Sequence, residues 1–246
     1  MELDTKYEWR QSADGSYTLY SKEYGECYHS LKDGALREAL KKHVKPAFEL
    51  THKSHLRILD ICFGLGFNTL ATLYHFSQQN RVRSLEIFSP ELDAHLLKTL
   101  PNFSYPKLLK PFVPVLFELI EHGKYECSNI SIELRVEDAR EYVKKVKEID
   151  VVYQDAFSPK KNPRLWTLEY FQDLYAVTSD DMVLTTYSIA TPVRLALAQA
   201  GFFVYEPLVE GIKKMTIASK KRLPLPPIDM EAKAKRSTSK PLRDKK

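Results

Sequence analysis

Acidic residues stand at or just beyond the ends of four short apolar segments, a pattern that can assemble a binding site. Such segments are typical of strands in a parallel sheet, whose two faces are both covered. The carboxyl ends of parallel strands meet at one edge of the sheet, so we expect the four carboxylates to lie together there. Carboxylates accept hydrogen bonds from hydroxyl and amino groups and attract cations. The residues are Asp60 in segment 56–61, Glu86 in 83–88, Asp138 after 130–136 and Asp155 after 149–154.

A glycine-containing turn follows the first of these segments. Gly64 and Gly66 lie between the strand that carries Asp60 and a helical pattern that begins at Phe67. A strand, a tight turn and a helix N-terminus together form a cradle of the nucleotide-binding type. Glycine has no side chain to keep a ligand away from the backbone. Cys62 stands where a full G-x-G-x-G turn has its first glycine. An ordinary buried strand–turn–helix is therefore the alternative interpretation.

Glu86 and Asp138 suit an adenosine group bound beside that turn. Glu86 has about the spacing of an acid that accepts both ribose hydroxyls. Asp138 could accept a hydrogen bond from the adenine amino group, or it could cap the helix that begins at Ala139. An acidic edge also suits a sulfonium cation, which points to S-adenosylmethionine as the bound molecule.

The segment Asp155-Ala-Phe-Ser-Pro159-Lys-Lys-Asn-Pro163 indicates chemistry on a nitrogen atom. An alkylamine must lose its proton before its lone pair can attack a methyl group. A carboxylate at Asp155 can take that proton or hold the amine in line. Phe157 can stack on a base, and the two prolines stiffen the loop. The alternative is a rigid turn before a helix that carries Trp166.

The elements that must position these residues alternate along the chain. Strands followed by helices predict a parallel sheet covered on both faces. Two final strands with no helix between them predict an antiparallel hairpin at one edge. This is the α/β plan of class I S-adenosylmethionine-dependent methyltransferases, a Rossmann-like, mostly parallel seven-stranded sheet. The expected strands are 56–61, 83–88, 130–136, 149–154, 182–187, 202–205 and 214–219, and the expected helices start at 67, after 90 and at 115, 139, 168 and 192.

Three parts are expected within the 246 residues. Residues 1–50 form an N-terminal extension, with a hairpin that turns at Asp14-Gly15 and a helix over 35–44. Residues 51–220 form the methyltransferase domain, in which the proline-rich stretch 100–129 is an insertion with a helix around 115–121. Residues 221–246 form a basic tail that we expect to be disordered.

Charge is unevenly spread along the chain. The net charge is +5, and residues 220–246 carry ten Lys or Arg against three Asp or Glu, which is +7 and leaves −2 for the rest. A basic tail can hold RNA or another polyanion, or it can simply keep the protein in solution.

The remaining composition argues against several classes of protein. The longest apolar stretch, 111–120, contains Pro114 and is too short to span a bilayer. The N-terminus has no signal-peptide pattern, so we expect a cytoplasmic protein. The three cysteines and seven histidines form neither a disulfide framework nor a spacing typical of metal sites, and no metal is expected.

At this point the sequence resembles one family closely, the methyltransferase domain of the bifunctional tRNA-modifying enzyme MnmC and its free-standing relatives. The turn Cys62-Phe-Gly-Leu-Gly-Phe-Asn-Thr-Leu70 is similar to that family's G-F-G-T-G-x-N-F-L. The loop Gln154 to Trp166 is similar to L-D-G-F-A-P-x-K-N-P-x-x-W. Tyr28-His-Ser30, Glu86 and Val193-Arg194 match as well, and the resemblance covers about residues 20–220.

The resemblance implies methyl transfer from S-adenosylmethionine to the 5-aminomethyl nitrogen of wobble uridine 34 in tRNA, giving 5-methylaminomethyl-(2-thio)uridine. It also implies a functional link to an enzyme that makes the aminomethyl precursor. By position Asp155 would be catalytic. The cofactor would contact Asp60, Gly64, Gly66, Asn68, Glu86 and Asp138, and the substrate would contact Tyr28, Phe157, Lys160 and Lys161.

The sequence departs from the family in several places. Cys62 and Ala156 replace glycines, Asp60 stands where Glu is frequent, and the basic segment near Glu210–Met215 is reduced. Nothing resembles the flavin-dependent oxidase half, so we expect no oxidase activity. Two rival functions remain. One is a spermidine-synthase-like aminopropyltransferase, and the other is a non-catalytic RNA-binding module with a decayed cofactor pocket.

Overall fold

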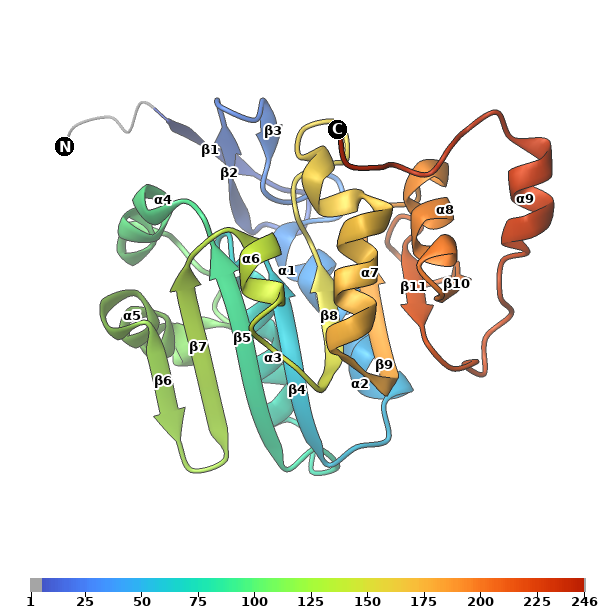
Figure 1. The fold of residues 1–246 in the computed structure, drawn as a ribbon. Coiled ribbons are helices and arrows are strands. Elements are labelled where there is room, and N and C mark those ends of the chain that lie inside the picture. The colour runs from blue at the N-terminus through green and yellow to red at the C-terminus, as the bar shows by residue number, and fades with distance from the viewer. Residues whose placement is uncertain (1–5, 246) are drawn as a thin grey trace.

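The computed structural model describes residues 6–245, and a twisted sheet runs through the middle of the protein (Figure 1). Among the described residues this sheet has eight strands in the order β10–β11–β9–β8–β4–β5–β7–β6. The strands from β9 to β7 are parallel, whereas β11 and β6 run antiparallel to their neighbours. Their bounds are β4 (His55–Ile61), β5 (Ser84–Glu91), β6 (Lys124–Cys127), β7 (Ile130–Val136), β8 (Ile149–Gln154), β9 (Thr178–Thr186), β10 (Phe203–Tyr205) and β11 (Thr216–Ser219).

Helices cover both faces of the sheet because its central strands are apolar on both sides. Every residue of β8 is buried. Side chains of β4 alternate between the two faces, with Leu56 and Ile58 in one hydrophobic cluster and Leu59 and Ile61 in the other. The first cluster includes α3 (Phe67–Ser77), α4 (Ala94–Thr99) and α5 (Val113–His122), and the second includes α6 (Ala139–Val143), α7 (Leu168–Val177) and α8 (Thr191–Gln199).

The strand order reverses at β4. The chain passes from β4 to β5 on one side and returns through β8 on the other, so the loops after these strands diverge. Such a reversal opens a crevice at the carboxyl ends of the strands, where ligands of open α/β sheets bind. The expected parallel sheet and its antiparallel edge hairpin, β10 with β11, are confirmed. The additional strand β6 was not predicted and pairs with β7 as a second antiparallel edge.

A small antiparallel sheet lies above those carboxyl ends (Figure 1). It consists of β1 (Tyr7–Gln11), β2 (Tyr17–Ser21) and β3 (Glu26–Cys27), and its first two strands form the expected hairpin. The Tyr7 hydroxyl donates a hydrogen bond to Asp93, which follows β5. The N-terminal extension is thereby tied to the edge where the site was expected.

The helix predicted over residues 35–44 is part of a longer helical run. It consists of α1 (Ala35–Glu38), a π-helical segment η1 (Ala39–Val44) and α2 (Lys45–Leu50). Pro46 has no N–H and its ring clashes with the preceding turn of a regular α-helix. The wider π-helical turns stand directly before it and let the helix continue.

The basic C-terminal tail, for which we expected disorder, contains one helix and makes several contacts with the rest of the protein. Just before helix α9 (Met230–Arg236), the Ile228 N–H donates a hydrogen bond to the Val204 carbonyl, with 2.8 Å between nitrogen and oxygen. Residues 237–245, here called the C-terminal strap, return to α7, where the Leu168 N–H donates to the Leu242 carbonyl. Asp244 accepts two hydrogen bonds from Arg140, at 2.6 and 2.8 Å. Ile228, Met230 and Leu242 pack against the second cluster, so a few apolar side chains anchor a segment whose overall composition is basic.

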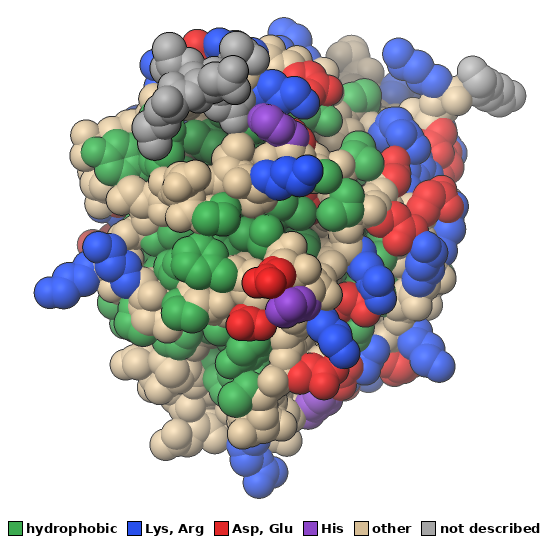
Figure 2. All heavy atoms as spheres, turned by 90° about the vertical axis from the view of Figure 1, so that its left-hand side faces the viewer, with side chains coloured by type: hydrophobic (Ala, Val, Ile, Leu, Met, Phe, Trp, Pro, Cys, Tyr) green, Lys and Arg blue, Asp and Glu red, His purple; other side chains and the backbone are tan. Residues whose placement is uncertain are grey.

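The remaining short helices are η2 (Leu100–Asn102), η3 (Lys110–Phe112) and η4 (Pro163–Trp166). Within the described range no helix is both long and apolar enough to cross a membrane. The face that carries α4 and α5 shows hydrophobic side chains over its centre (Figure 2). The exposed large hydrophobic residues of the protein include Leu92, Leu108 and Phe117.

Candidate active site

A cavity of about 540 Å³ opens where β4, β5 and β8 end. Its volume lies in the range usual for small-molecule and cofactor sites. Residues beside the strands of the N-terminal sheet contribute to its lining, namely Lys6, Tyr24 and Tyr28. The cavity is also lined by Cys62, Gly64, Asn68, Glu91, Asp138, Arg140, Asp155, Phe157, Lys161 and Arg164.

The turn after β4 brings the backbone into this cavity. Gly64 and Gly66 both have positive φ, 56° and 73°. A Cβ at Gly64 would lie 3.3 Å from the Tyr28 ring, and one at Gly66 would lie 3.0 Å from the Phe63 ring. Glycine is therefore required at Gly66 by both the dihedral angle and the available space. Helix α3 begins at the next residue, which places its N-terminal N–H groups at the edge of the cavity.

Cys62 adopts the same left-handed conformation as the glycines, with φ of 64°. The expected glycine is absent from the sequence, but the backbone shape of the turn is kept. The thiol lines the cavity. Burial raises its pKa well above the ordinary value, and the carboxylates of Glu91, Asp155, Asp60 and Asp138 act in the same direction. The thiol is thus a neutral, apolar wall of the site.

The position expected for Glu86 is wrong because β5 does not end at Phe88. The strand continues to Glu91, which places Glu86 near the opposite end. Glu86 pairs there with Arg57 at 2.5 Å and with His55 at 2.9 Å, and it is not among the residues that line the cavity. Pro90 is tolerated in this central strand because the pairing of β5 with β4 has already stopped at Phe88.

Glu91 occupies the place that was expected for Glu86. Its side chain is buried at the cavity wall and accepts hydrogen bonds from the N–H groups of Gly64 and Asp93, both at 2.8 Å. Burial raises the pKa of Glu91, although the N–H groups of Asp93 and Gly64 oppose this. The carboxylate therefore joins the glycine turn to the end of β5. A pattern-based reading missed it because Pro90 resembles a strand terminator.

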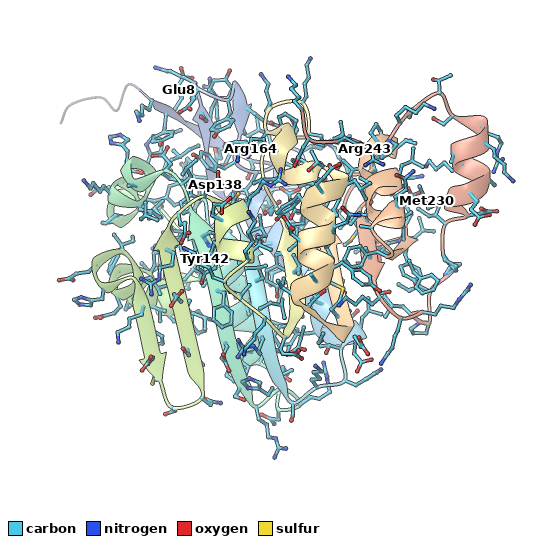
Figure 3. All side chains as sticks on the ribbon, viewed as in Figure 1. Glu8, Asp138, Tyr142, Arg164, Met230 and Arg243 are labelled. Carbon is cyan, nitrogen blue, oxygen red and sulfur yellow. The ribbon has the colours of Figure 1, made fainter. Side chains whose placement is uncertain are left out.

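Asp138 caps a helix, which is one of the two interpretations that the sequence left open, and it also faces the cavity. Its carboxylate accepts a hydrogen bond from the Arg140 N–H at 2.8 Å and so caps α6. It also lines the cavity and pairs with Arg164 at 3.2 Å. Figure 3 shows Asp138 and Arg164 close together above α6.

Asp155 lies at the base of the cavity, directly after β8. Its Oδ2 accepts a hydrogen bond from Asn68 Nδ2 at 2.9 Å, and its Oδ1 lies 3.4 Å from His43 Nε2. Burial acts to raise the pKa of Asp155. His43, His29 and Asn68 together outweigh burial, so the pKa of Asp155 lies below its ordinary value. Asp155 is therefore ionised at neutral pH.

Asp60 lies behind Asp155 and has the opposite electrostatic character. Asn68 Nδ2 reaches its Oδ1 at 3.3 Å, and the Thr69 hydroxyl donates to its Oδ2 at 2.9 Å. Burial, with the charge of Asp155 in addition, raises the pKa of Asp60 to about 7, against the action of Thr69, His43 and Asn68. Two carboxyl groups joined by one amide thus titrate far apart. Asp60 is not among the residues that line the cavity, so it supports the site from behind.

Aromatic rings cover the mouth of the cavity beside Asp155. The Phe157 ring stacks on Tyr24 with 4.3 Å between ring centres and meets Tyr28 at 4.8 Å. The Trp166 indole N–H donates to the Phe157 carbonyl at 2.8 Å and fixes this loop. Lys161 lines the cavity, whereas the exposed Lys160 does not.

Pattern-based reasoning also missed His43, His29 and Tyr24. All three come from the N-terminal extension, which no strand-end rule connects to the sheet. Tyr28-His-Ser30 was noted as a match, but nothing in the sequence assigned a place to His29. In the structure Tyr24 and His29 line the cavity, and His43 stands behind Asp155. Within residues 6–245 no group of three His, Cys, Asp or Glu side chains is placed to hold a metal ion.

The donor set fits an elongated ligand with a sugar and a positive charge. The glycine turn offers space for close backbone approach, and Glu91 offers a carboxylate for hydroxyl groups. Asn68 Oδ1 is buried and accepts no hydrogen bond from the described residues. Asp155 adds a negative charge at the base. These features agree with a nucleoside that carries a cation.

Comparisons with known proteins agree with this geometry. The model of a family described as S-adenosyl-L-methionine-dependent methyltransferase matches residues 104–222. The crystal structure of MnmC2 from Aquifex aeolicus superimposes with a TM-score of 0.87 and 35% sequence identity, over 99% of this chain and 81% of that one.

Two curated relatives are longer than this chain. An uncharacterised protein of Methanocaldococcus jannaschii is 35% identical over 89% of this chain and 61% of its own length. The tRNA 5-methylaminomethyl-2-thiouridine biosynthesis bifunctional protein MnmC of Burkholderia vietnamiensis is 30% identical over 75% of this chain and 31% of its own length. The chain therefore spans less than two thirds of either relative.

Proposed function

Because the chain belongs to the MnmC-like family of S-adenosyl-L-methionine-dependent methyltransferases, we propose that it methylates the 5-aminomethyl nitrogen of the wobble uridine in tRNA. The product would be 5-methylaminomethyl-(2-thio)uridine. The name of the MnmC relatives refers to biosynthesis of this nucleoside. The observation that carries the proposal is an ionised carboxylate, Asp155, at the base of the cavity beside the glycine turn.

The cofactor is S-adenosyl-L-methionine, and several residues of this chain suit its parts. Glu91 would accept hydrogen bonds from the ribose hydroxyls, the role that Glu86 cannot fill from the far end of β5. Asp138 would face the adenine amino group, and Gly64 would let the backbone approach. Asn68 Oδ1 would accept from an ammonium or amine group, because the Nδ2 of the same amide is already held by two carboxyl groups. S-adenosyl-L-methionine supplies a methyl group on a positively charged sulfur, which keeps the electron pair of the broken bond and becomes a neutral thioether.

Asp155 would manage the proton of the substrate. A primary alkylammonium has no free lone pair at nitrogen, so it cannot form the new N–C bond until one proton leaves. The ionised carboxylate of Asp155 accepts that proton and releases it to solvent after transfer. The amine is meanwhile held in line with the methyl group by the same hydrogen bond.

Phe157 and its neighbours would hold the uracil base. Tyr24, Tyr28 and Phe157 present ring faces and edges at the mouth of the cavity. Stacking of an unpaired base on an aromatic side chain is the usual way in which proteins hold single-stranded RNA. Lys161 at the cavity wall and Lys160 on the outside of the same loop would face the phosphates of the anticodon loop.

The direct test is nucleoside mass spectrometry. tRNA that carries 5-aminomethyl-2-thiouridine is incubated with the protein and S-adenosyl-L-methionine, and the wobble nucleoside is analysed. We expect a gain of one methyl group on the exocyclic nitrogen, and none with tRNA that has an unmodified wobble uridine. Asp155→Asn serves as the control for adventitious methylation.

Other outcomes would favour the rival functions. Transfer of an aminopropyl group from decarboxylated S-adenosylmethionine to a small amine would indicate the aminopropyltransferase. Binding of tRNA without binding of S-adenosyl-L-methionine would indicate an RNA-binding module. Either result contradicts the proposal.

A further inference from the structure

His43 is fully buried directly behind Asp155. It lies on the π-helical segment η1, and its Nε2 points to Asp155 Oδ1 across 3.4 Å. Nδ1 lies 2.9 Å from the hydroxyl of Thr185 on β9. Nε2 makes no hydrogen bond within the usual limits to any described residue. A buried ring nitrogen that faces a carboxylate and has no other partner needs an explanation.

Thr185 lets the imidazole adopt the orientation that a carboxylate requires. A hydroxyl can donate or accept, so it satisfies Nδ1 whether or not that nitrogen carries a proton. In both cases Nε2 can carry a hydrogen that points at Asp155 Oδ1. The second carboxylate oxygen is already held by Asn68. Asn68 therefore contacts one carboxylate oxygen of Asp155 and His43 faces the other, and the remaining lone pairs can face the cavity.

The helical run around His43 is fixed by a buried ion cluster. Lys42 Nζ lies 2.8 Å from Asp33 and 2.7 Å from Glu38, and all three side chains are almost fully buried. This cluster and the π-helical turns before Pro46 hold the backbone of His43 in place. Contacts within the protein therefore position His43 beside Asp155, and no bound ligand is needed for this arrangement.

We propose that His43 is a positioning residue that orients Asp155 toward the cavity and keeps its carboxylate ionised until it accepts the substrate's proton. This inference rests on the proposed function and adds a residue to it. The other titratable groups that face His43 are Asp60 on β4, Tyr153 on β8 and His29 after β3. Of these, Asp60 and His29 also act on Asp155, so the tests below compare variants of His43 in an otherwise unchanged surrounding.

The first test needs no substrate. Protein with ¹³C-labelled aspartate is titrated by NMR, and the Asp155 carboxyl signal is assigned from its loss in Asp155→Asn. We expect the pKa of Asp155 to rise by about one unit or more in His43→Leu, because an adjacent group that favours the ionised form is removed. An unchanged midpoint in a folded His43→Leu protein overturns the inference, whatever the reaction proves to be.

The second test is the pH profile of kcat/KM for methylation of tRNA, from pH 4 to 9. In His43→Leu the acid limb should move up by about the same one unit. At neutral pH, kcat should fall roughly tenfold because the carboxylate is no longer oriented toward the substrate, while the affinity for S-adenosyl-L-methionine stays within about twofold. His43→Gln keeps a side-chain N–H that can reach Asp155 and should recover most of kcat at pH 9. A purely structural histidine would lower the melting temperature and leave the shape of the profile unchanged.

Thr185→Val covers the possibility that His43→Leu does not fold. It nearly keeps the shape of the side chain but removes the partner of Nδ1, so it should shift the acid limb in the same direction by less. A wild-type profile for a folded Thr185→Val protein would contradict the inference. Absence of methylation by the wild-type protein would instead refute the proposed function and leave the NMR result standing.

Discussion

Glu86 and Glu91 lie on the same strand, yet only Glu91 reaches the cavity. Glu86 is paired with Arg57 and His55 on the surface, and Glu91 accepts N–H hydrogen bonds from the glycine turn. The pair therefore offers a matched comparison within one strand. Glu91 is proposed to bind the ribose, whereas Glu86 has the same side chain but lies outside the cavity.

Glu91→Gln should weaken binding of S-adenosyl-L-methionine by roughly tenfold to a hundredfold. The variant loses a charged acceptor for the ribose hydroxyls, and hydrogen bonds to charged groups contribute about 1.5–3 kcal/mol. Isothermal titration calorimetry measures the affinity. Glu86→Gln is the control and should bind like the wild type. If the two variants bind equally well, Glu91 does not contact the cofactor.

Asp155→Asn should keep the fold and the affinity for S-adenosyl-L-methionine while kcat falls by roughly 10²-fold or more, the usual scale for a positioned acid–base group. The defect should become smaller as the pH rises, because more of the substrate amine is then already neutral. Single-turnover methylation assays from pH 6 to 9 measure it. Near wild-type turnover at neutral pH would show that Asp155 is structural.

The turn between β4 and α3 illustrates how an element can keep its shape after a sequence change. Cys62 holds a left-handed conformation that glycine would adopt at lower cost. At ordinary helix or strand positions alanine is more stable than glycine by about 0.5–1 kcal/mol. The left-handed region reverses this order, because the Cβ of an L-residue costs about 1–2 kcal/mol there.

We therefore expect Cys62→Gly to be more stable than Cys62→Ala by about 1 kcal/mol. Both variants lose the thiol, so the comparison isolates the backbone conformation. Urea denaturation at constant pH measures the two free energies of unfolding. The ordinary order, with alanine more stable, would mean that the turn relaxes out of the left-handed region.

The buried end of β4 should make stability depend on pH through Asp60. Its pKa is about 7 in the folded protein, so the native state holds a proton that the unfolded chain has lost above pH 4. The free energy of unfolding contributed by this group therefore falls as the pH rises through 7. When the pH is raised from 5 to 8, the free energy of unfolding of the wild type should fall by roughly 2 kcal/mol more than that of Asp60→Asn. Denaturation curves of both proteins at the two pH values test this, and parallel pH dependences would refute it.

On the scale of the whole molecule, the basic tail is divided between two places. Helix α9 lies at the β10 edge of the sheet, whereas the C-terminal strap ends near the loop after β8 (Figure 1). Arg243 lies toward that loop and Met230 lies on the distant helix (Figure 3). Within the strap, Arg243 is paired with Glu169, and Asp244 is paired with Arg140 of α6. The lysines beside the cavity are therefore better candidates for phosphate contacts than α9 is.

Binding of tRNA should weaken steeply with salt, because Lys and Arg contacts release counterions from phosphates. The double variant Lys160→Ala/Lys161→Ala should reduce the slope of log affinity against log salt by up to about two. The variant of α9 with Lys233, Lys235 and Arg236 changed to alanine should bind like the wild type. Filter binding at several salt concentrations compares them. A larger loss from the α9 variant would move the RNA surface to the far edge of the sheet.

Residue patterns were sufficient to predict the architecture and the two loops, after β4 and β8, that line the cavity. Apolar strands alternating with helices require a covered parallel sheet, and the glycine turn and the loop at Asp155 follow from local patterns of a few residues. Helix α5, strand β7 and the hairpin of β10 with β11 were predictable for the same reason. Local backbone preferences and side-chain periodicity act over short distances along the chain, and both can be read without a structure.

Only the folded structure shows which distant residues join these two loops at the cavity. Glu91 depends on how far β5 extends, which is set by its pairing with β7 and not by Pro90. His43 and Tyr24 reach Asp155 and Phe157 only because the N-terminal extension folds over the carboxyl edge of the sheet. The tail contacts the rest of the protein through a few apolar side chains and through the pairs Arg140–Asp244 and Arg243–Glu169, which its average composition does not indicate. Packing between segments that are distant along the chain leaves no periodic pattern in the sequence, so these contacts could not be predicted from it.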